Sequence, residues 1–598
     1  MKELAALNKY FLKYRWRILA GIFCVISANL LNAYIPKITG QAVNLISDTL
    51  KSASELNSVS VEVRNSVAWM VFMLFLKYLG VALLAGTFTF MMRQSIIVVS
   101  RLIEFDLKND IYDHYQKLDL AFYRKNNTGD LMSRITEDVS RVRMYIGPAI
   151  MYAVNLLFTI IFAVTFMLQI DAKLTIYVLI PLPVLSVIIY FVNEKIEKAS
   201  THIQAKLSDL TTNAQETYSG IRVVQSYTRE QEMLEFFAKE TDDYKIKQLK
   251  LARIDSIYFP VMTFLVGVST VIVVYLGGIH VSDGIIKSGD LVSFIGYVNM
   301  LMWPVSSLGW TASLIQRAAA SQKRINEFLS RKPAIANGMV KDFQLKGEVV
   351  FKDVSFTYPD TGIRAIKNLS FTIKSGQRIA IIGRTGSGKT TIADLVMRMY
   401  DVSSGEIQVD GKNIKEYDLH SFRAQIGFVP QDVFLFSETI TENINFGVAE
   451  SSKAKAVEFA QLASIASEIE RFSDSFETMV GERGVTLSGG QKQRISIARA
   501  LVKQPQLLIL DDSLSAVDAS TEKQIQQNLD KALSGKTAII ITHRIFSLIH
   551  FDNIVVIDEG TIVEQGTHDA LMAHKGVYFE IFNRQMSEST ESLNTVSF

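Results

Sequence analysis

The 598-residue chain is too long for a single ordinary domain, and 48% of its residues are hydrophobic. Lysine and arginine number 62 against 60 aspartates and glutamates, so the formal net charge is +2 and no basic tract is dense enough to bind nucleic acid. The single cysteine, Cys24, excludes an intrachain disulfide framework and a cysteine metal site, and we expect it to be a small apolar packing residue.

The apolar residues gather in long runs before about residue 310, whereas charge and glycine are mixed among them afterwards. A membrane part should therefore precede a soluble part. The first 17 residues are rich in lysine and arginine, but the apolar stretch that follows is too long for a signal peptide and lacks a small-residue cleavage site before Pro36. We interpret it as a retained first spanning helix whose N-terminus is cytoplasmic.

Six runs approach the roughly 20 apolar residues that a helix needs to cross about 30 Å of hydrocarbon. They cover approximately residues 18–35, 67–92, 151–170, 174–192, 257–279 and 291–308. Three of the connections, 48–64, 171–173 and 280–290, contain few cations and are predicted to lie outside.

The other two connections are long and rich in cations, so the positive-inside rule places them in the cytoplasm. Both are predicted to be long helices that reverse at turns, 126–129 in one and 219–220 in the other. We expect them to form rigid arms that extend out of the bilayer. The alternative is that the charged helices are an ordinary solvent-exposed surface without a specific role.

Lys77 lies well inside the second apolar run, where an ionisable group is costly unless it meets water or a partner. One hypothesis is that it faces a cavity and binds substrate. The alternative, a structural hydrogen bond with polar groups such as Asn29 and Asn32, is at least as well supported by the sequence.

After a polar stretch at 331–346, short apolar runs alternate with helical segments, a pattern that predicts an α/β domain with a mainly parallel sheet and a β-rich entry. The strand 378–382 leads into a complete phosphate-binding loop, and a helix opens at Thr391. Backbone N–H groups, the helix N-terminus and Lys389 would bind the phosphates of ATP, while the Thr390 hydroxyl could ligate Mg²⁺. The residues of this candidate site are Gly383, Thr385, Gly386, Ser387, Gly388, Lys389, Thr390 and Thr391.

A buried strand at 507–510 delivers Asp511, whose carboxylate can hold Mg²⁺ through water. Leu487-Ser488-Gly489-Gly490-Gln491 precedes a second helix and forms a second phosphate cradle in the same domain. One nucleotide does not need two such cradles.

Together with Tyr358, Gln431, residues 515–518 and His543, these motifs closely resemble the ATP-binding-cassette (ABC) transporter family, and the six-helix half resembles its exporter branch. Residues 122–134 and 220–224 are similar to the cytoplasmic arms of that branch, and 480–484 is an exporter-type feature before the signature sequence. The resemblance covers essentially the whole chain.

The resemblance implies that Tyr358 stacks on adenine, that Gln431 senses Mg²⁺ and the attacking water, and that His543 contacts the γ-phosphate. Each residue alone could be an ordinary strand or turn residue, but they occur together in the family order. Ser488, Gly489, Gly490 and Gln491 would cap ATP bound to the opposite subunit. The resemblance thus implies two nucleotides held between two domains, so hydrolysis requires a dimer.

Asp512 departs from the family, most of whose active members carry glutamate there as the base for the attacking water. Aspartate is one methylene shorter, and a misplacement of about 1 Å can cost on the order of a hundredfold in rate. The site is therefore expected to hydrolyse slowly. Such a subunit fits a heterodimer in which its intact signature completes the partner's site, while the retained His543 leaves a homodimer open.

We therefore expect an exporter that moves lipophilic drug-like molecules or lipids by alternating access. The alternative is an ATP-gated channel or regulatory subunit. An exported peptide is disfavoured because no peptidase-like domain precedes the helices. The expected organisation is a transmembrane domain at 1–325, a linker at 326–346, a nucleotide-binding domain at 347–585 and a polar tail at 586–598, in the plasma (bacterial inner) membrane with the nucleotide-binding domain cytoplasmic.

Overall fold

The computed structural model describes residues 2–55, 61–481, 484, 486–543 and 551–595, and the chain divides into two compact units. The helical unit comprises Met1–Gln116 and Gly129–Arg331. The α/β unit comprises Lys117–Thr128 and Lys332–Phe598, so a short segment from within the first half of the chain belongs to the second unit.

The helical unit consists of long helices whose apolar stretches lie inside much longer elements. The α-helices are α1 (Asn8–Lys13), α2 (Arg15–Glu55), α3 (Val61–Lys117), α5 (Thr128–Ser133), α6 (Val139–Met144), α7 (Ile150–Ile170), α8 (Ala172–Leu179), α9 (Pro181–Ser219), α10 (Ile221–Ser226), α11 (Glu230–Ser282) and α12 (Ser288–Leu329), and a 3₁₀ helix, η1 (Lys2–Leu7), precedes them. At 1.5 Å per residue the 57 residues of α3 extend over about 85 Å, far more than the 30 Å of a bilayer core.

Five helical segments in the described part of the chain are long and apolar enough to span a membrane. They contain five of the six predicted runs. The fourth predicted run, 174–192, is divided between α8 and α9, where Pro181 begins a new helix after Ile180. Some side chains of this run fall outside the described ones.

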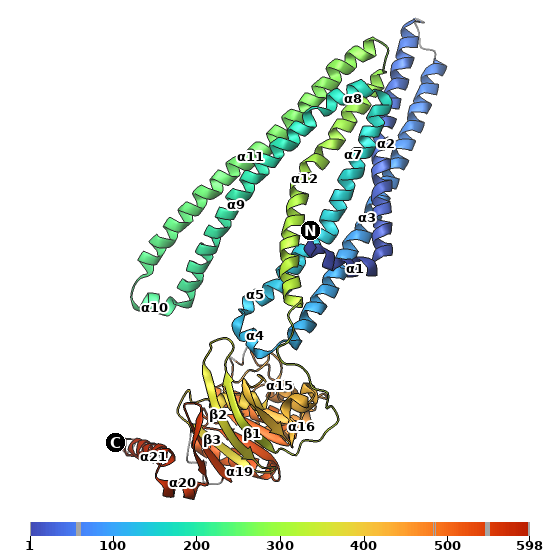
Figure 1. The fold of residues 1–598 in the computed structure, drawn as a ribbon. Helices are drawn as coiled ribbons and strands as arrows, with labels where there is room; N and C mark the ends of the chain where they lie inside the picture. The colour runs from blue at the N-terminus through green and yellow to red at the C-terminus, as the bar shows by residue number, and fades with distance from the viewer. Residues whose placement is uncertain (1, 56–60, 482–483, 485, 544–550, 596–598) are drawn as a thin grey trace. The chain divides into compact units, whose positions relative to one another are not determined.

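The two long connections are mostly helical and contain the predicted turns, although in the first of them α3 already ends at Lys117, before the predicted turn. In the first connection, α4 (Leu120–Lys125) ends before its C-cap residue Asn126, and α5 begins at Thr128. In the second connection, α9 ends at Ser219 and the short helix α10 joins it to α11. Helices α9 and α11 lie side by side over their length (Figure 1).

Two five-residue π-helical segments, η2 (Arg134–Asp138) and η3 (Tyr145–Ala149), interrupt the helix that follows α5. A π-helical turn inserts an extra residue into the ladder of hydrogen bonds; such turns are rare and occur frequently at functional sites. Pro148, which cannot donate to the ladder, lies within η3.

The α/β unit contains the mainly parallel sheet that the alternation of strands and helices predicted, and its β-rich entry forms a separate antiparallel sheet. The antiparallel sheet has the order β2-β1-β4-β5, and the larger sheet has the order β10-β9-β3-β8-β7-β6, in which only β10 is antiparallel. The strands are β1 (Val349–Thr357), β2 (Arg364–Ile373), β3 (Arg378–Gly383), β4 (Ser404–Val409), β5 (Lys412–Asn413), β6 (Ile426–Val429), β7 (Leu507–Asp511), β8 (Thr537–Ile541), β9 (Asn553–Asp558) and β10 (Thr561–Gly566). All five residues of β7 are buried, as expected of a central parallel strand.

Helices pack against the strands of this unit and complete its hydrophobic cores. They are α13 (Lys389–Val396), η4 (Ile414–Glu416), α14 (Leu419–Ala424), α15 (Ile440–Asn445), α16 (Lys453–Leu462), α17 (Ala466–Ile469), η5 (Ser475–Glu477), α18 (Gly489–Leu501), α19 (Ala519–Ala532), α20 (His568–His574) and α21 (Val577–Thr595). One core packs the antiparallel sheet against α13 and the larger sheet, and a second core lies beneath α15, α16 and α18.

The tip of the first arm belongs to the α/β unit. Asp119 caps α4 by accepting a hydrogen bond from the Phe122 N–H, and its other oxygen accepts one from the Ala334 N–H at 2.9 Å. Leu120 and Ala121 pack against the core that contains β1 and α13, and Phe122 is buried. The short helix is thus held by the same core that positions the phosphate-binding loop.

Candidate functional site

The candidate nucleotide site lies where four neighbouring parallel strands end. The order β3-β8-β7-β6 brings together the loop after β3, His543 after β8, Asp511 at the end of β7 and Gln431 after β6. Carboxyl ends of adjacent parallel strands share one edge of a sheet, and ligands of open α/β sheets bind there. A cavity of about 400 Å³ is lined by Tyr358, Lys389, Thr390, Gln431, Asp511, Asp512 and His543, among others.

The phosphate loop has the backbone that its glycines predicted. Gly388 has φ +98°, and a Cβ there would stand 2.6 Å from the Ala365 carbonyl oxygen, while a Cβ on Gly383 would stand 2.0 Å from that of Ile557. Helix α13 begins at Lys389, whose ammonium donates to the carbonyls of Gly383 and Arg384 at 3.0 and 2.7 Å. Burial lowers the pKa of Lys389, so an anion in the loop would stabilise its charge.

Asp511 and Thr390 suit a magnesium ion. Asp511 is 1% exposed, and its Oδ2 has no hydrogen-bond partner among the described residues. Burial, with the charge of Asp512 beside it, raises the pKa of Asp511 to about 6, although the Thr390 hydroxyl donates to it. A divalent cation would stabilise this buried carboxylate. The described residues hold no cluster of three or more His, Cys, Asp or Glu, so further ligands would have to be hydroxyl, amide, water and phosphate oxygens.

Asp512 occupies a conformation that few residues adopt. Its φ is +46°, in the left-handed region where aspartate is better tolerated than longer side chains. Its N–H donates to the Ile541 carbonyl at 2.9 Å, which ties the residue after β7 to the end of β8. The backbone at this position is therefore fixed by the sheet.

Tyr358 lines the same cavity and contacts residues of two helices, α13 and α4, and Tyr400 in the segment between α13 and β4. Its hydroxyl is 2.8 Å from Thr391 Oγ1 in α13, and its ring meets that of Tyr400 edge-on at a centroid distance of 5.5 Å. The guanidinium carbon of Arg124, from α4, lies 5.3 Å from the centroid of the same ring. Asp394, which is 7% exposed, is a further member of this cluster, and burial raises its pKa to about 6 although the charge of Arg124 opposes the shift.

His543 is supported by a residue that the sequence analysis did not identify. Gln585 in α21 donates its amide to the main-chain carbonyl of His543 at 2.5 Å. A second cavity, of about 390 Å³, is lined by the phosphate loop, His543 and this helix. Burial lowers the pKa of His543, and the nearby charge of Lys389 lowers it further, which favours the neutral imidazole. Arg544 lies outside the described residues.

The signature residues do not line the 400 Å³ cavity. Ser488 and Gln491 form a reciprocal capping box at the start of α18, in which Gln491 Oε1 accepts from the Ser488 N–H at 2.9 Å and Ser488 Oγ accepts from the Gln491 N–H at 3.3 Å. Ser488 and Gly489 are exposed. The start of α18 is thus an exposed helix N-terminus that is not part of the chain's own nucleotide cavity. Of the preceding motif, Glu482 and Arg483 lie outside the described residues.

Gln493, which sequence reasoning also missed, joins the signature helix to the loop after Asp512. Its amide donates to Ser515 Oγ at 3.2 Å, and its Oε1 accepts from the Ala516 N–H at 3.1 Å. Gln493 is 7% exposed, so these bonds are shielded from water. The glutamine could have been suspected from its place two residues after the signature sequence, but its partners depend on the fold.

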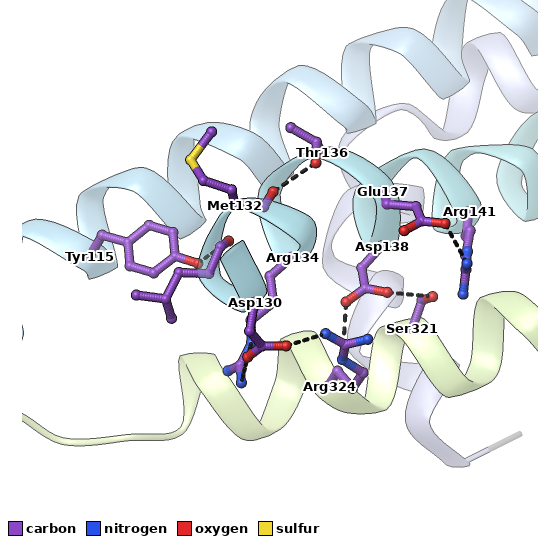
Figure 2. A network of polar contacts seen from close by, with 11 residues as sticks. Tyr115, Asp130, Met132, Arg134, Thr136, Glu137, Asp138, Arg141, Ser321 and Arg324 are labelled. Atoms are coloured by element: carbon purple, nitrogen blue, oxygen red, sulfur yellow. Dashed lines mark hydrogen bonds and ion pairs between the residues drawn. The ribbon is translucent and has the colours of Figure 1, made fainter. Parts of the chain in front are cut away.

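In the helical unit the motif of the first arm is tied to α12 by an ion-pair network (Figure 2). Asp130 accepts from Arg134 at 2.6 Å and from Arg324 at 2.7 Å. Asp138, which is 1% exposed, accepts from the Ser321 hydroxyl at 2.8 Å, and its other oxygen lies 3.3 Å from Arg324 Nε. The network holds α5 and η2 against the last part of α12.

Lys77 meets neither of the partners suggested from the sequence. Its ammonium donates to the Tyr34 hydroxyl at 3.2 Å and lies 5.1 Å from the centroid of that ring. Asn29 instead donates to Asn155 at 2.8 Å and accepts from the Thr159 hydroxyl. A cation–π contact is worth about 0.5–2 kcal/mol, whereas a lysine deep in a spanning helix costs about 2.5–3.5 kcal/mol. The tyrosine alone does not offset that cost.

A phosphate-binding α/β unit in one chain with membrane-spanning helices defines a membrane-embedded nucleoside triphosphatase. Residues 18–305 match the family described as ABC transporter transmembrane region, and residues 366–515 match the family described as ABC transporter. The chain belongs to the ABC transporter family: it is a multi-pass membrane protein that carries its own ATP-binding, ATP-hydrolysing domain.

Similarity to curated proteins extends over almost the whole chain. The chain is 36% identical to the probable multidrug resistance ABC transporter ATP-binding/permease protein YheI of Bacillus subtilis (strain 168) and 33% identical to the multidrug resistance-like ATP-binding protein MdlA of Escherichia coli (strain K12), with 98% of both chains covered in each case. It is also 35% identical to the ATP-dependent lipid A-core flippase of Syntrophus aciditrophicus (strain SB), over 81% of this chain and 80% of the flippase.

Proposed function

We propose that the chain is one half of an ATP-driven exporter that moves lipophilic drug-like molecules or lipids outward or between leaflets, and that a second subunit completes its nucleotide sites. The observation that carries the dimer is the position of Ser488 and Gly489, exposed at the start of α18 and absent from the lining of the chain's own nucleotide cavity. A helix N-terminus of this kind can bind phosphate, and in this proposal the phosphate belongs to ATP held on the phosphate loop of the second subunit.

The residues at the strand ends have distinct roles in this proposal. Tyr358 stacks on adenine, the loop N–H groups and Lys389 bind the phosphates, and Thr390, Asp511 and Gln431 hold the magnesium ion. Magnesium, when bound, would neutralise charge on the terminal phosphates. Asp512 receives the proton of the attacking water, and His543, held by Gln585, donates a hydrogen bond to the γ-phosphate.

The membrane arrangement follows from the helices and the distribution of charge. We infer six spanning helices, with the run at 174–192 as the fourth, and a cytoplasmic N-terminus and α/β unit because the two long connections are rich in cations. The arms are then cytoplasmic extensions of the helices. Closure of two nucleotide-binding domains on ATP would be transmitted to the helices through arm tips such as α4.

A heterodimer is favoured over a homodimer because Asp512 is shorter than glutamate by one methylene. The subunit would contribute its signature to the competent site of its partner and keep the slower site itself. The relatives carry transporter and flippase names, so the channel or regulatory alternative is not favoured.

The direct test is ATP-dependent transport in sealed proteoliposomes. The purified chain would be reconstituted alone and with a candidate partner, and uptake of a lipophilic dye into inside-out vesicles would be followed with the ATPase rate. Lys389→Ala should abolish the rate wherever this chain contributes the active phosphate loop, whereas Lys374→Ala, which removes an exposed lysine that does not line the nucleotide cavity, should not. If ATP only allowed the dye to move down its concentration gradient, the proposal that the chain is an exporter would be disproved. Substrate-stimulated ATPase in the chain alone would show a homodimer.

A further inference from the structure

Two lysines from different spanning helices converge on one aromatic ring. Lys37 in α2 and Lys77 in α3 place their ammonium nitrogens 6.0 and 5.1 Å from the centroid of Tyr34. Lys37 is also 5.5 Å from the centroid of Phe166 in α7. We propose that Lys37 and Lys77, gathered around Tyr34, bind the anionic headgroup of an amphiphile.

The depth of Lys77 distinguishes it from an ordinary interfacial lysine. Along α3 it lies 13 residues from Arg64 and 16 from Arg93, or about 20 and 24 Å at 1.5 Å per residue. A lysine can extend its ammonium group towards the membrane surface only over the length of its own side chain. Lys77 instead extends towards Tyr34, so its charge stays inside the bilayer region.

No carboxylate in the described part of the helical unit pairs with Lys37 or Lys77 within 4.0 Å. Elsewhere in the same unit the chain does pair its lysines: Lys287 lies 2.9 Å from Asp48. Two like charges around one ring repel each other, and in a spanning helix a tyrosine face and one hydroxyl would not replace water around the exposed ammonium of Lys77. Their position is explained if an anion joins them.

An aromatic surface continues from the two lysines. Tyr34 and Phe166 have centroids 6.3 Å apart, and Phe166 stacks parallel to Tyr297 of α12 at 6.2 Å. Tyr297 is fully buried, and its hydroxyl lacks a hydrogen-bond partner among the described residues. A buried tyrosine normally uses its hydroxyl, so an unsatisfied one at the end of this array is a second sign of a missing polar ligand group.

The ligand class follows from these parts: a phosphate or carboxylate group for the lysines and an acyl or aromatic body for the rings. Anionic phospholipids and anionic drug-like molecules share this chemistry. The site rests on the proposed exporter for its role, since it would give that exporter a preference for anionic cargo over neutral or cationic cargo.

The test measures binding separately from transport. The full-length chain in nanodiscs of phosphatidylcholine would be titrated with acyl-labelled phosphatidylglycerol, with phosphatidylcholine carrying the same label, and with alkyl-fluorescein and an uncharged alkyl dye. The double change Lys37→Met/Lys77→Met should lower the affinity for the anionic probes at least about tenfold, the factor expected from losing a charge-assisted hydrogen bond. The affinity for the neutral probes should change by no more than about twofold. Lys173→Met, which removes an exposed lysine in the first turn of α8, is the matched control.

The outcomes separate the sources and the two proposals. Loss of phosphatidylglycerol binding alone identifies a lipid headgroup site, and loss of alkyl-fluorescein binding alone identifies a site for organic anions. Equal affinity of the wild type for anionic and neutral probes, or an unchanged double variant, would overturn the site. If binding shows the predicted loss but no probe is transported with ATP, the exporter fails and the site stands.

Discussion

Arg124 and Tyr358 form a cation–π contact with 5.3 Å between the guanidinium carbon and the ring centroid. Arg124 comes from α4, the tip of the first arm, and Tyr358 is the residue proposed to stack on adenine. The same guanidinium lies 5.7 Å from the centroid of Tyr400, so it contacts two rings of one cluster. The tip of the arm thus touches a residue that lines the candidate nucleotide cavity of the α/β unit.

We predict that Arg124→Ala weakens ATP binding about two- to fivefold, because a partly exposed cation–π contact is worth about 0.5–1 kcal/mol. The arginine holds the Tyr358 ring in place, so KM for ATP should rise with little change in kcat. Nucleotide titration with a fluorescent ATP analogue and steady-state ATPase assays would measure both. Lys125→Ala, the neighbouring exposed cation, is the control; equal effects of the two changes would contradict a specific contact.

The parts of the site that the sequence predicted are those with local signals. The phosphate loop is one continuous motif between a strand and a helix, and Asp511 and His543 follow short apolar strands whose parallel pairing brings their ends together. Arg124, Gln493 and Gln585 could not be found in this way, because each acts through a partner far away in the sequence. Their contacts depend on how the first arm, the signature helix and α21 pack.

The helical unit shows the same division. Five of its six apolar runs lie in described helices that are long and apolar enough to span a membrane, and the cation-rich connections are mostly helical. The suggested structural partners of Lys77 were wrong, since helical spacing on α2 says which residues share a face but not which face meets α3. The structure pairs Lys77 with Tyr34, and Asn29 bonds to α7 instead.

We predict that Asp512→Glu raises ATP turnover at this site by up to on the order of a hundredfold, since the longer side chain moves the carboxylate by about 1 Å towards its working position. The gain should be accompanied by lower thermal stability, because φ is +46° here and glutamate tolerates the left-handed region less well than aspartate. ATPase rates in each assembly, with melting temperatures, would measure both effects. Asp512→Asn should lower turnover, and an unchanged rate in every assembly would show that Asp512 is not limiting.

We predict that magnesium-dependent nucleotide binding weakens on acidification below pH 6. The pKa of Asp511 is raised to about 6 without metal, and a metal ligand must be deprotonated, so affinity should fall by up to about tenfold per pH unit below that value. The free energy of unfolding depends on pH in the opposite direction. Between about pH 4 and 6 the folded chain holds a proton on Asp511 that the unfolded chain lacks, so the contribution of Asp511 to stability is present at low pH and is lost as pH rises through 6.

The measurement is titration of a fluorescent ATP analogue from pH 5 to 8, with magnesium and with a chelator. Asp511→Asn should remove the magnesium-dependent part of the slope, while titration of the nucleotide itself is common to both proteins. Asp394→Asn is the matched control, because burial raises the pKa of Asp394 to the same value but its side chain does not line the cavity. A slope that survives in Asp511→Asn would place the titrating group elsewhere.

We predict that Asp138→Ala destabilises the helical unit far more than Asp130→Ala, although both contact Arg324 (Figure 2). Asp138 is 1% exposed and accepts from Ser321, so its loss leaves a buried hydroxyl and part of a guanidinium without an acceptor, at a cost of about 1–3 kcal/mol. Asp130 has a side chain that is 40% exposed, and exposed ion pairs contribute about 0–1 kcal/mol. Melting of the full-length protein followed by intrinsic fluorescence would rank the two variants. Asp138→Asn, which keeps an acceptor for Ser321, should recover part of the lost stability. If Asp138→Asn were as unstable as Asp138→Ala, the ion pair between the Asp138 carboxylate and Arg324 would be the dominant contact between η2 and α12.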